Sequence, residues 1–280
     1  ITRLKPKESE TVISAYFEDS EDAGKPKVLP ENADSVFMGS IPLGDGFILS
    51  ASEAKGYLGT RNYSQEILPL LNGQEVNSDP AQEPTRYVIS LEKYHSLEDA
   101  EAACPELVAR VRTLVLPERL AQKNTGAKEK WWRYYRHNKD CYAKSSLLGG
   151  CFITAATTKY LNFSWTLSGR IFTHALFSFT TDRWDQYAIV QSTLHEIWAR
   201  KYSGALETRL RYSPTDCFET FPFPEGLWQT ANPTLAEIGE RYHEHRRALM
   251  RHLWLGLTDI YNLFHTRDLT PLVVAKISKK

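Results

Sequence analysis

The sequence predicts an α+β protein, with a strand-rich part that extends to about residue 230 and a helical segment after it. Residues 149–167, GGCFITAATTKYLNFSWTL, are rich in β-branched and aromatic side chains, which favour two strands around a turn near Lys159. Further along, Asn232-Pro233-Thr234 opens LAEIGERYHEHRRALMRHLWLGL, which is typical of a long helix with a polar face. This order of strands and then helices defines the predicted class.

Length and composition are those of a soluble globular protein. With 280 residues, 42% of them hydrophobic and 24% charged, the chain can bury a sizeable core as one large domain or two of ordinary size. We expect a polar lead-in over residues 1–35, a strand-rich domain over 36–230 and a helical segment over 231–280. No apolar run approaches the roughly 18 residues of a membrane span, and no signal peptide opens the sequence. We therefore expect a cytoplasmic protein with no membrane partner.

In the first half of the chain, turn formers separate short predicted elements. Residues 47–49 form a short apolar strand, after which Ser50 or Ser52 caps a helix that carries Glu53. An Asn-Gly turn at residues 72–73 and a second turn at 77–80 precede a β-rich run over 86–91. Helical periodicity then covers 97–123 and is broken at Pro105. It places four apolar side chains on one face: Leu107, Val111, Leu114 and Val115.

The second half contains one further strand and three helical stretches. Residues 170–181, RIFTHALFSFTT, indicate the strand, residues 184–202 an amphipathic helix, and DIYNLFH a second helix after the long one. Two Phe-Pro steps at residues 221–224 cannot belong to a core strand, because each proline removes a backbone donor. Side chains two residues apart leave the same face of an extended chain. Both phenyl rings should therefore anchor an extended edge segment to the core.

Cysteine spacing and net charge limit the function classes. Cys104, Cys141, Cys151 and Cys217 form no CxxC pair and have no histidine at ligand spacing, so we expect no zinc site and a reduced setting. The formal net charge of zero argues weakly against a nucleic-acid partner. Residues 110–139, however, carry nine basic and two acidic residues, a local excess of about seven positive charges.

Familiar catalytic motifs are missing from the sequence. It contains no GxGxxG, P-loop or GxSxG motif, and LHEIWA lacks the second histidine of HExxH because Ala199 stands there. Asp45, Glu53 and Lys55 fit a loose nuclease-like pattern that also arises by chance in a charged helix start. His243 and His245 point to different faces of a helix, and we expect a solvated surface there and no metal site.

The stretch KEKWWRYYR, residues 128–136, interleaves cations with aromatics. Such a pattern can hold phosphates by charge while the rings pack or stack on bases. Alternatively, the four rings are half core and the arginines extend outward along them. The segment TAATTKY, residues 154–160, offers Thr157, Thr158 and Lys159, whose types can reach base edges but are also common in ordinary turns.

Several stretches that occur in one order resemble a known family: LLNGQEVNSDPAQEPTRYVI, KWWRYYR, CFITAATTKY, LHEIWARKYSGALETRLRYSPTDCFETFPFP and LTDIYNLFH. They are similar to the C-terminal target-recognition region of single-chain adenine-specific DNA methyltransferases. These are the type IIG and IIL restriction–modification enzymes and their relatives in bacterial and archaeal phage defence. The resemblance covers roughly residues 36–268, and residues 194–224 are its most specific part.

The resemblance implies a β-rich DNA target-recognition domain followed by a helical spacer. The Phe-Pro segment would be the stiff connector between the two parts. A complete enzyme of this kind also has a glycine-rich cofactor loop and an Asn-Pro-Pro-aromatic motif, and neither occurs here. We therefore expect a fragment or a separate specificity chain that is not an enzyme on its own and holds no cofactor, an interpretation that the abrupt KISKK end also favours. S-adenosylmethionine and methyl transfer would belong to an N-terminal methyltransferase domain of the same parent protein.

On this interpretation the chain binds double-stranded DNA sequence-specifically. The expected phosphate contacts are Lys123, Lys128, Lys130, Arg133 and Arg136. The expected base contacts are Thr157, Thr158, Lys159, Arg209 and Arg211. Two alternatives from other classes remain open at this point. One is a protein-interaction module of a defence complex, and the other is a magnesium-dependent nuclease that uses Asp45, Glu53 and Lys55.

Overall fold

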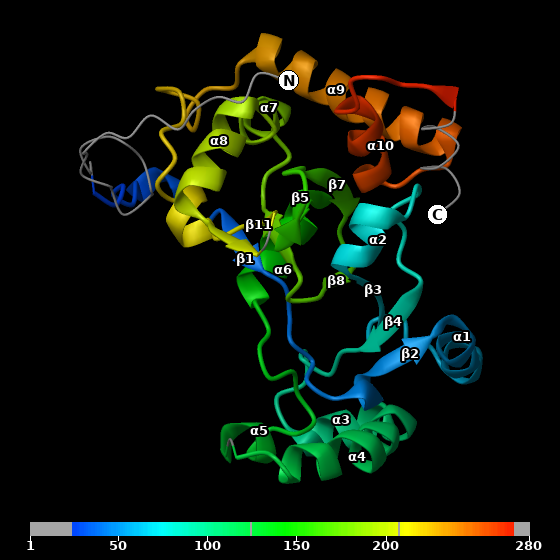
Figure 1. Ribbon diagram of the computed structural model, residues 1–280. Helices are drawn as coiled ribbons and strands as arrows, with labels where there is room; N and C mark the ends of the chain where they lie inside the picture. The colour runs from blue at the N-terminus through cyan, green and yellow to red at the C-terminus, as the bar shows by residue number, and fades with distance from the viewer. Residues whose placement is uncertain (1–23, 124, 207, 272–280) are drawn as a thin grey trace, which may run out of the picture.

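The computed structural model describes residues 24–123, 125–206 and 208–271. Its secondary structure is mixed, which confirms the α+β prediction. Figure 1 shows three levels: helices α7 to α10 at the top, small sheets in the middle, and α3 to α5 as a separate layer at the bottom. Residues 1–23 of the predicted lead-in and the KISKK end lie outside the described residues.

The strands form three small sheets. The first is antiparallel throughout, in the order β1 (Val36–Met38), β9 (Leu176–Phe179), β5 (Gly150–Ala155), β7 (Ser164–Leu167). The second has the order β2 (Ile48–Ser50), β4 (Arg86–Ile89), β3 (Ile67–Leu71), β8 (Ile171–Phe172), and its last pair is parallel. The third is antiparallel, in the order β10 (Gly204–Leu206), β11 (Arg209–Arg211), β6 (Thr157–Thr158).

The helices surround these sheets. They are α1 (Ala51–Thr60), α2 (Gly73–Ser78), α3 (Leu97–Ala103), α4 (Pro105–Leu120), α5 (Thr125–Glu129), α6 (Lys139–Leu147), α7 (Trp184–Val190), α8 (Thr193–Tyr202), α9 (Pro233–Leu253) and α10 (Leu257–Phe264). Short 3-10 turns cover Pro30–Asn32 and Asp45–Phe47, and a π turn covers Pro214–Phe218. Within the described residues, no helix is long and apolar enough to cross a bilayer.

Local capping signals place most helix starts correctly. Ser50 and Glu53 form the expected capping box of α1, and Pro105 separates α3 from α4. The Asn-Gly turn is a wrong prediction, because Asn72 accepts a hydrogen bond from the Gly73 N–H and begins α2. Three residues of the predicted face of α4 are buried, whereas Leu114 lies at its edge and is 44% exposed.

Two elements predicted as continuous are divided. Residues 170–181 form β8 and β9, which belong to different sheets. Residues 184–202 form α7 and α8, because Ser192 interrupts the helix and caps its second part. Neither break changes the apolar pattern, so periodicity alone could not reveal them.

The Phe-Pro segment is anchored by its rings, as predicted, but it is not an extended sheet edge. The rings of Phe221 and Phe223 meet edge to face at 5.1 Å within a larger aromatic cluster. Phe223 N donates to Phe221 O at 3.0 Å, so the chain turns at Pro222. The Asn32 side chain donates to Phe221 O at 2.9 Å, so it is the end of the lead-in that holds this segment.

The helical segment packs directly on the strand-rich part. Asn232 caps α9, and Gly239 lets α9 lie against the Trp184 carbonyl of α7. The expectation of a solvated surface holds for His245 but is wrong for His243, which is 3% exposed. Its Nε2 accepts from Trp165 N at 3.0 Å, because α9 turns this face toward β7. The domain boundaries at residues 35 and 230 stay predictions.

Candidate nucleic-acid interface

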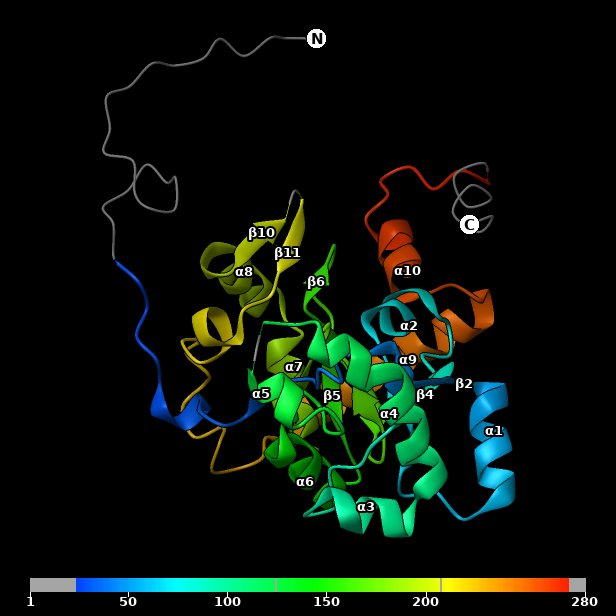
Figure 2. The ribbon, with the colours of Figure 1, turned by 90° about the horizontal axis from the view of Figure 1, so that it is seen from below.

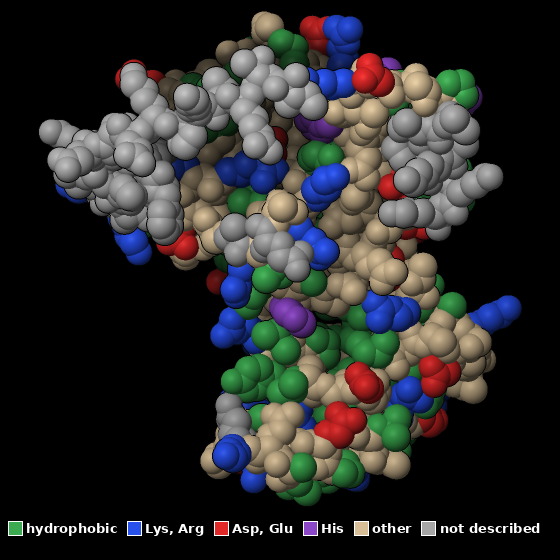
Figure 3. All heavy atoms as spheres, viewed as in Figure 1, with side chains coloured by type: hydrophobic (Ala, Val, Ile, Leu, Met, Phe, Trp, Pro, Cys, Tyr) green, Lys and Arg blue, Asp and Glu red, His purple; other side chains and the backbone are tan. Residues whose placement is uncertain are grey.

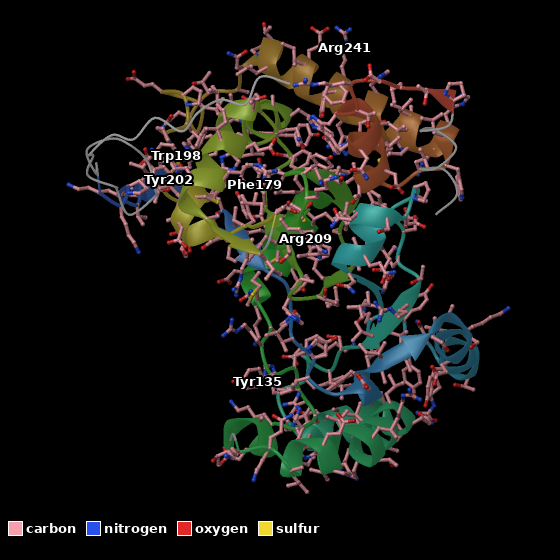
Figure 4. The ribbon with its side chains drawn as sticks, viewed as in Figure 1. Tyr135, Phe179, Trp198, Tyr202, Arg209 and Arg241 are labelled. Carbon is pink, nitrogen blue, oxygen red and sulfur yellow. The ribbon has the colours of Figure 1, made fainter. Side chains whose placement is uncertain are left out.

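The third sheet brings together four of the five predicted base-contact residues. On β11, Leu210 is buried while Arg209 and Arg211 are exposed on the opposite face, as alternation along a strand requires. Arg211 pairs with Thr157 of β6 and Leu210 with Thr158. Figure 4 places Arg209 near the centre of the face in view, between α8 and α2.

The two threonines of β6 differ in what they present to a ligand. Thr158 is 4% exposed, and its hydroxyl donates to Tyr160 O at 2.7 Å. Thr157 is only partly buried and lies opposite Arg211. The exposed polar surface of this sheet is therefore formed by Thr157, Arg209 and Arg211.

Lys159 is bound to helix α10. Its Nζ donates to Asn262 Oδ1 at 2.6 Å, and Tyr160 OH donates to the same oxygen at 3.1 Å. The Tyr160 ring stacks on His265, with centroids 4.9 Å apart and planes 11° from parallel. The loop after β6 is thus fixed by the helical segment. The position from which Lys159 could contact DNA is therefore set by α10.

An open groove of about 600 Å³ lies between this sheet and α2. Thr157 and Arg211 line one side, and Gln74 and Asn77 of α2 line the other. Small side chains of residues 155, 156 and 175 also line it. Its other polar side chains are those of Asn72, Ser78, His174 and Tyr212. Sequence patterns did not predict the α2 and β8–β9 residues of the groove, because residues 72–80 resemble turns and residues 170–181 resemble one strand. The amide side chains of Gln74 and Asn77, which follow Asn72, were the sequence feature that could have indicated a polar groove.

Most of the aromatic rings of KEKWWRYYR belong to the core. Trp131, Trp132 and Tyr134 are at most 9% exposed, and Tyr135 is 45% exposed. The half-core alternative is therefore correct for this stretch. Tyr135 is the exposed ring of the stretch. Figure 4 labels it on the segment that leads to the bottom layer.

The basic stretch divides into structural and surface residues. Arg110 binds Gly46 O and Glu53, and Arg119 is fully buried. Arg133 donates to the carbonyls of Tyr94 and His95, and its guanidinium lies 4.6 Å from the centre of the Trp132 ring. The exposed side chains are those of Arg112, which pairs with Glu101, and of Lys123, Lys130, Arg136 and Lys139, and Lys128 is partly buried. On the face shown in Figure 3, Lys and Arg side chains gather over the upper part and the waist.

Residues 25–225 match the family model described as the MmeI target recognition domain. The chain belongs to this family. This confirms the resemblance seen in the sequence.

The fold of this target recognition domain is similar to a solved structure of the type IIL restriction–modification enzyme MmeI in complex with DNA. The TM-score is 0.69 at 16% sequence identity, with 95% of this chain and 34% of the MmeI chain covered. The chain therefore spans about a third of the length of that enzyme. No curated protein sequence matches the chain.

Membership of the MmeI family does not favour the two alternative functions, and neither does the geometry. Glu53 is occupied by the capping box and by Arg110 at 3.0 Å, and the hydrogen bonds from Ser50 lower the pKa of its carboxyl. In the described part of the chain, no three His, Cys, Asp or Glu side chains are grouped as metal ligands. A protein-interaction module would need exposed aromatic rings to dock a partner, and most rings of residues 128–136 are buried.

Proposed function

We propose that this chain recognises a short base sequence in duplex DNA, as the specificity part of a restriction–modification enzyme. The observation that carries the proposal is the match to the MmeI target recognition domain over residues 25–225. The exposed arginines of β11 support it, because arginine binds O6 and N7 of guanine through two parallel hydrogen bonds in the major groove.

The contacts fall into two classes. Arg211 and Thr157, which line the groove, and the exposed Arg209 and Lys159 contact base edges, whereas Thr158 supports the loop from within. Lys123, Lys128, Lys130 and Arg136 contact phosphates and fix the register on the duplex without carrying sequence information. Arg133 already binds two carbonyls and contributes less.

The parent protein is, on this proposal, an adenine-specific DNA methyltransferase of the bacterial or archaeal cytoplasm. Its catalytic domain binds S-adenosylmethionine, and the present chain holds the duplex while the target adenine is extruded. Methyl transfer belongs to that domain, and the chain described here supplies recognition.

Selection from random duplexes tests the proposal. Fluorescence anisotropy at two salt concentrations first measures binding of the pool, and repeated selection then identifies the enriched word. The unsubstituted chain should enrich one short word, and Arg211→Ala should lose the preference at one guanine by about tenfold or more. Arg241→Ala is the matched control, because Arg241 is an exposed arginine on α9 at the top of Figure 4, away from the third sheet. Binding by the unsubstituted chain without enrichment of any word would refute the proposal.

A further inference from the structure

Helix α2 is short but held on several sides. Its Glu75 carboxylate is buried and accepts hydrogen bonds from Thr85 at 3.1 Å and Arg86 at 3.4 Å. Gln82 donates to Val76 O at 2.7 Å, so the following turn also holds the helix. Where α10 begins, a Cβ on Gly256 would meet the Ser78 backbone at 2.5 Å, so the two helices touch. These contacts give α2 a fixed orientation.

The outward side of α2 presents amide side chains to the groove. Gln74 and Asn77 are three residues apart and therefore lie on the same face of the helix. Gln74 is exposed, whereas Asn77 is partly buried. The Asn77 Oδ1 is buried and has no hydrogen-bond partner among the described residues. Leaving such an oxygen unpaired costs stability, so the fold itself does not explain an asparagine at this position.

The residue types on the two walls suit different bases. Glutamine and asparagine bind N6 and N7 of adenine, as arginine binds O6 and N7 of guanine. Arg211 and Thr157 stand on the wall opposite Gln74, across the same groove of about 600 Å³. Two rigid elements on opposite walls can contact different base pairs of one site.

We propose that α2 is a second base-reading element, in which Gln74 recognises an adenine at a position of the DNA word distinct from that read by Arg211. The inference rests on the proposed function. Asn77 lies one turn further along α2 and lines the same wall. The carbonyl of the Gln74 amide accepts from the adenine N6 amino group, and its NH₂ donates to N7.

The test is duplex selection with the full chain and its variants. Gln74→Ala should lose the adenine preference at one position by about tenfold or more, without loss of affinity for random duplexes. Gln74→Arg should replace adenine by guanine at that position. Gln229→Ala is the matched control, since Gln229 is an exposed glutamine that does not line the groove. Because Gln74 is exposed, these changes should not unfold the chain.

The outcomes separate the two proposals. If the unsubstituted chain enriches a word and Gln74→Ala enriches the same word equally well, α2 is not a reading element, and the proposed function stands. If Gln74→Ala lost the base preference at the same position as Arg211→Ala, α2 would not be a separate second reading element. If the unsubstituted chain enriches no word, the proposed function fails and the inference fails with it.

Discussion

Two buried arginines hold parts of the chain that are distant in sequence. Arg119 is fully buried and donates to the carbonyls of Pro42 at 2.6 Å and Leu43 at 2.7 Å. Arg246 is 5% exposed and donates to Tyr261 OH at 3.0 Å and Gln191 Oε1 at 3.2 Å. A buried charge costs free energy unless its donors are satisfied. These two residues therefore stabilise the fold and contribute nothing to a DNA-binding surface.

Two buried histidines, His195 and His243, and the partly buried His137 are neutral in the folded chain at neutral pH. Burial lowers the pKa of His195 from 6.5 to about 3. It also lowers the pKa of His137 to about 4, with a smaller effect of Lys139, and that of His243 to about 4, with a smaller effect of Arg246. His195 Nε2 lies 2.9 Å from Tyr212 OH, so a neutral imidazole fits the site.

These histidines predict a loss of stability in mild acid. Well above pH 6.5 neither the folded nor the unfolded state binds a proton at these sites, so the histidines do not lower the stability there. As the pH falls from 6.5 toward 4, the unfolded chain becomes protonated first, and each histidine lowers the free energy of unfolding by up to about 1.4 kcal/mol per pH unit. Urea unfolding at pH 7.5 and 5.5 measures the difference. His195→Gln should reduce it by about one third, and the exposed His245→Ala should leave it unchanged. Equal stability at both values would contradict the prediction.

At the level of single residues, the sequence shows which types of side chain are present but not which of them the fold buries. The spacing of His243 and His245 correctly places them on different faces, but it does not show which face packs on β7. The charge excess over residues 110–139 is real, but several of its arginines bind carbonyls or carboxylates within the fold. Burial depends on contacts between distant segments, which a charge count does not contain.

Among the elements, α10 connects the two walls of the groove. Its start touches α2 at Ser78, and its last turns hold Lys159 and Tyr160 through Asn262 and His265. Figures 1 and 2 both place α10 beside α2. The helical segment therefore fixes the relative position of α2 and the loop after β6, a role more specific than that of a spacer.

The packing of α9 on α7 predicts a clear effect of one methyl group. A Cβ on Gly239 would lie 2.3 Å from the Trp184 carbonyl oxygen, so the two helices must separate to accept it. Gly239→Ala should destabilise the chain by about 1–3 kcal/mol. Gly56→Ala is the control, because Gly56 lies within α1 with nothing within 4 Å of its Cβ position. That change should stabilise by about 0.5–1 kcal/mol. Thermal unfolding of both variants tests the pair, and an unchanged Gly239→Ala variant would show that the helices are not in close contact.

Element prediction succeeds where the signal is local. Ser50, Pro105 and Asn232 mark helix starts through their own side chains or rings, and the structure has helices that begin beside them. Strand pairing is not local in this sense. Residues 170–181 look like one strand, but their two halves join different sheets because Ile171 pairs with Leu70 and Phe179 with Val36. The groove beside α2 could not be predicted for the same reason.

For the whole molecule, the net charge of zero conceals local excesses of charge, such as the nine basic and two acidic residues over 110–139. On the face in Figure 3, Lys and Arg side chains gather over the upper part and the waist, and Asp and Glu side chains occur among them and over the lower part. Local excesses of this kind matter for a duplex, because the field along the surface, not the sum of charges, acts on the phosphates. The proposed DNA binding is therefore compatible with a balanced composition.

The salt dependence of binding should report the phosphate contacts separately from the base contacts. Each phosphate contact releases counterions and adds about 0.9 to the slope of log affinity against log salt concentration. Lys130 and Arg136 are exposed basic residues at the lower layer and at the segment that leads to it. Replacing both by Gln should reduce the slope by about 2 and weaken binding to every duplex equally, with the selected word unchanged.

Lys55→Gln, on the exposed side of α1, is the control and should change neither the slope nor the selected word. Anisotropy titrations from 50 to 200 mM salt, a range of about fourfold, provide the slopes. A double variant with the original slope but an altered word would assign Lys130 and Arg136 to the bases and remove the distinction between the two classes of contact.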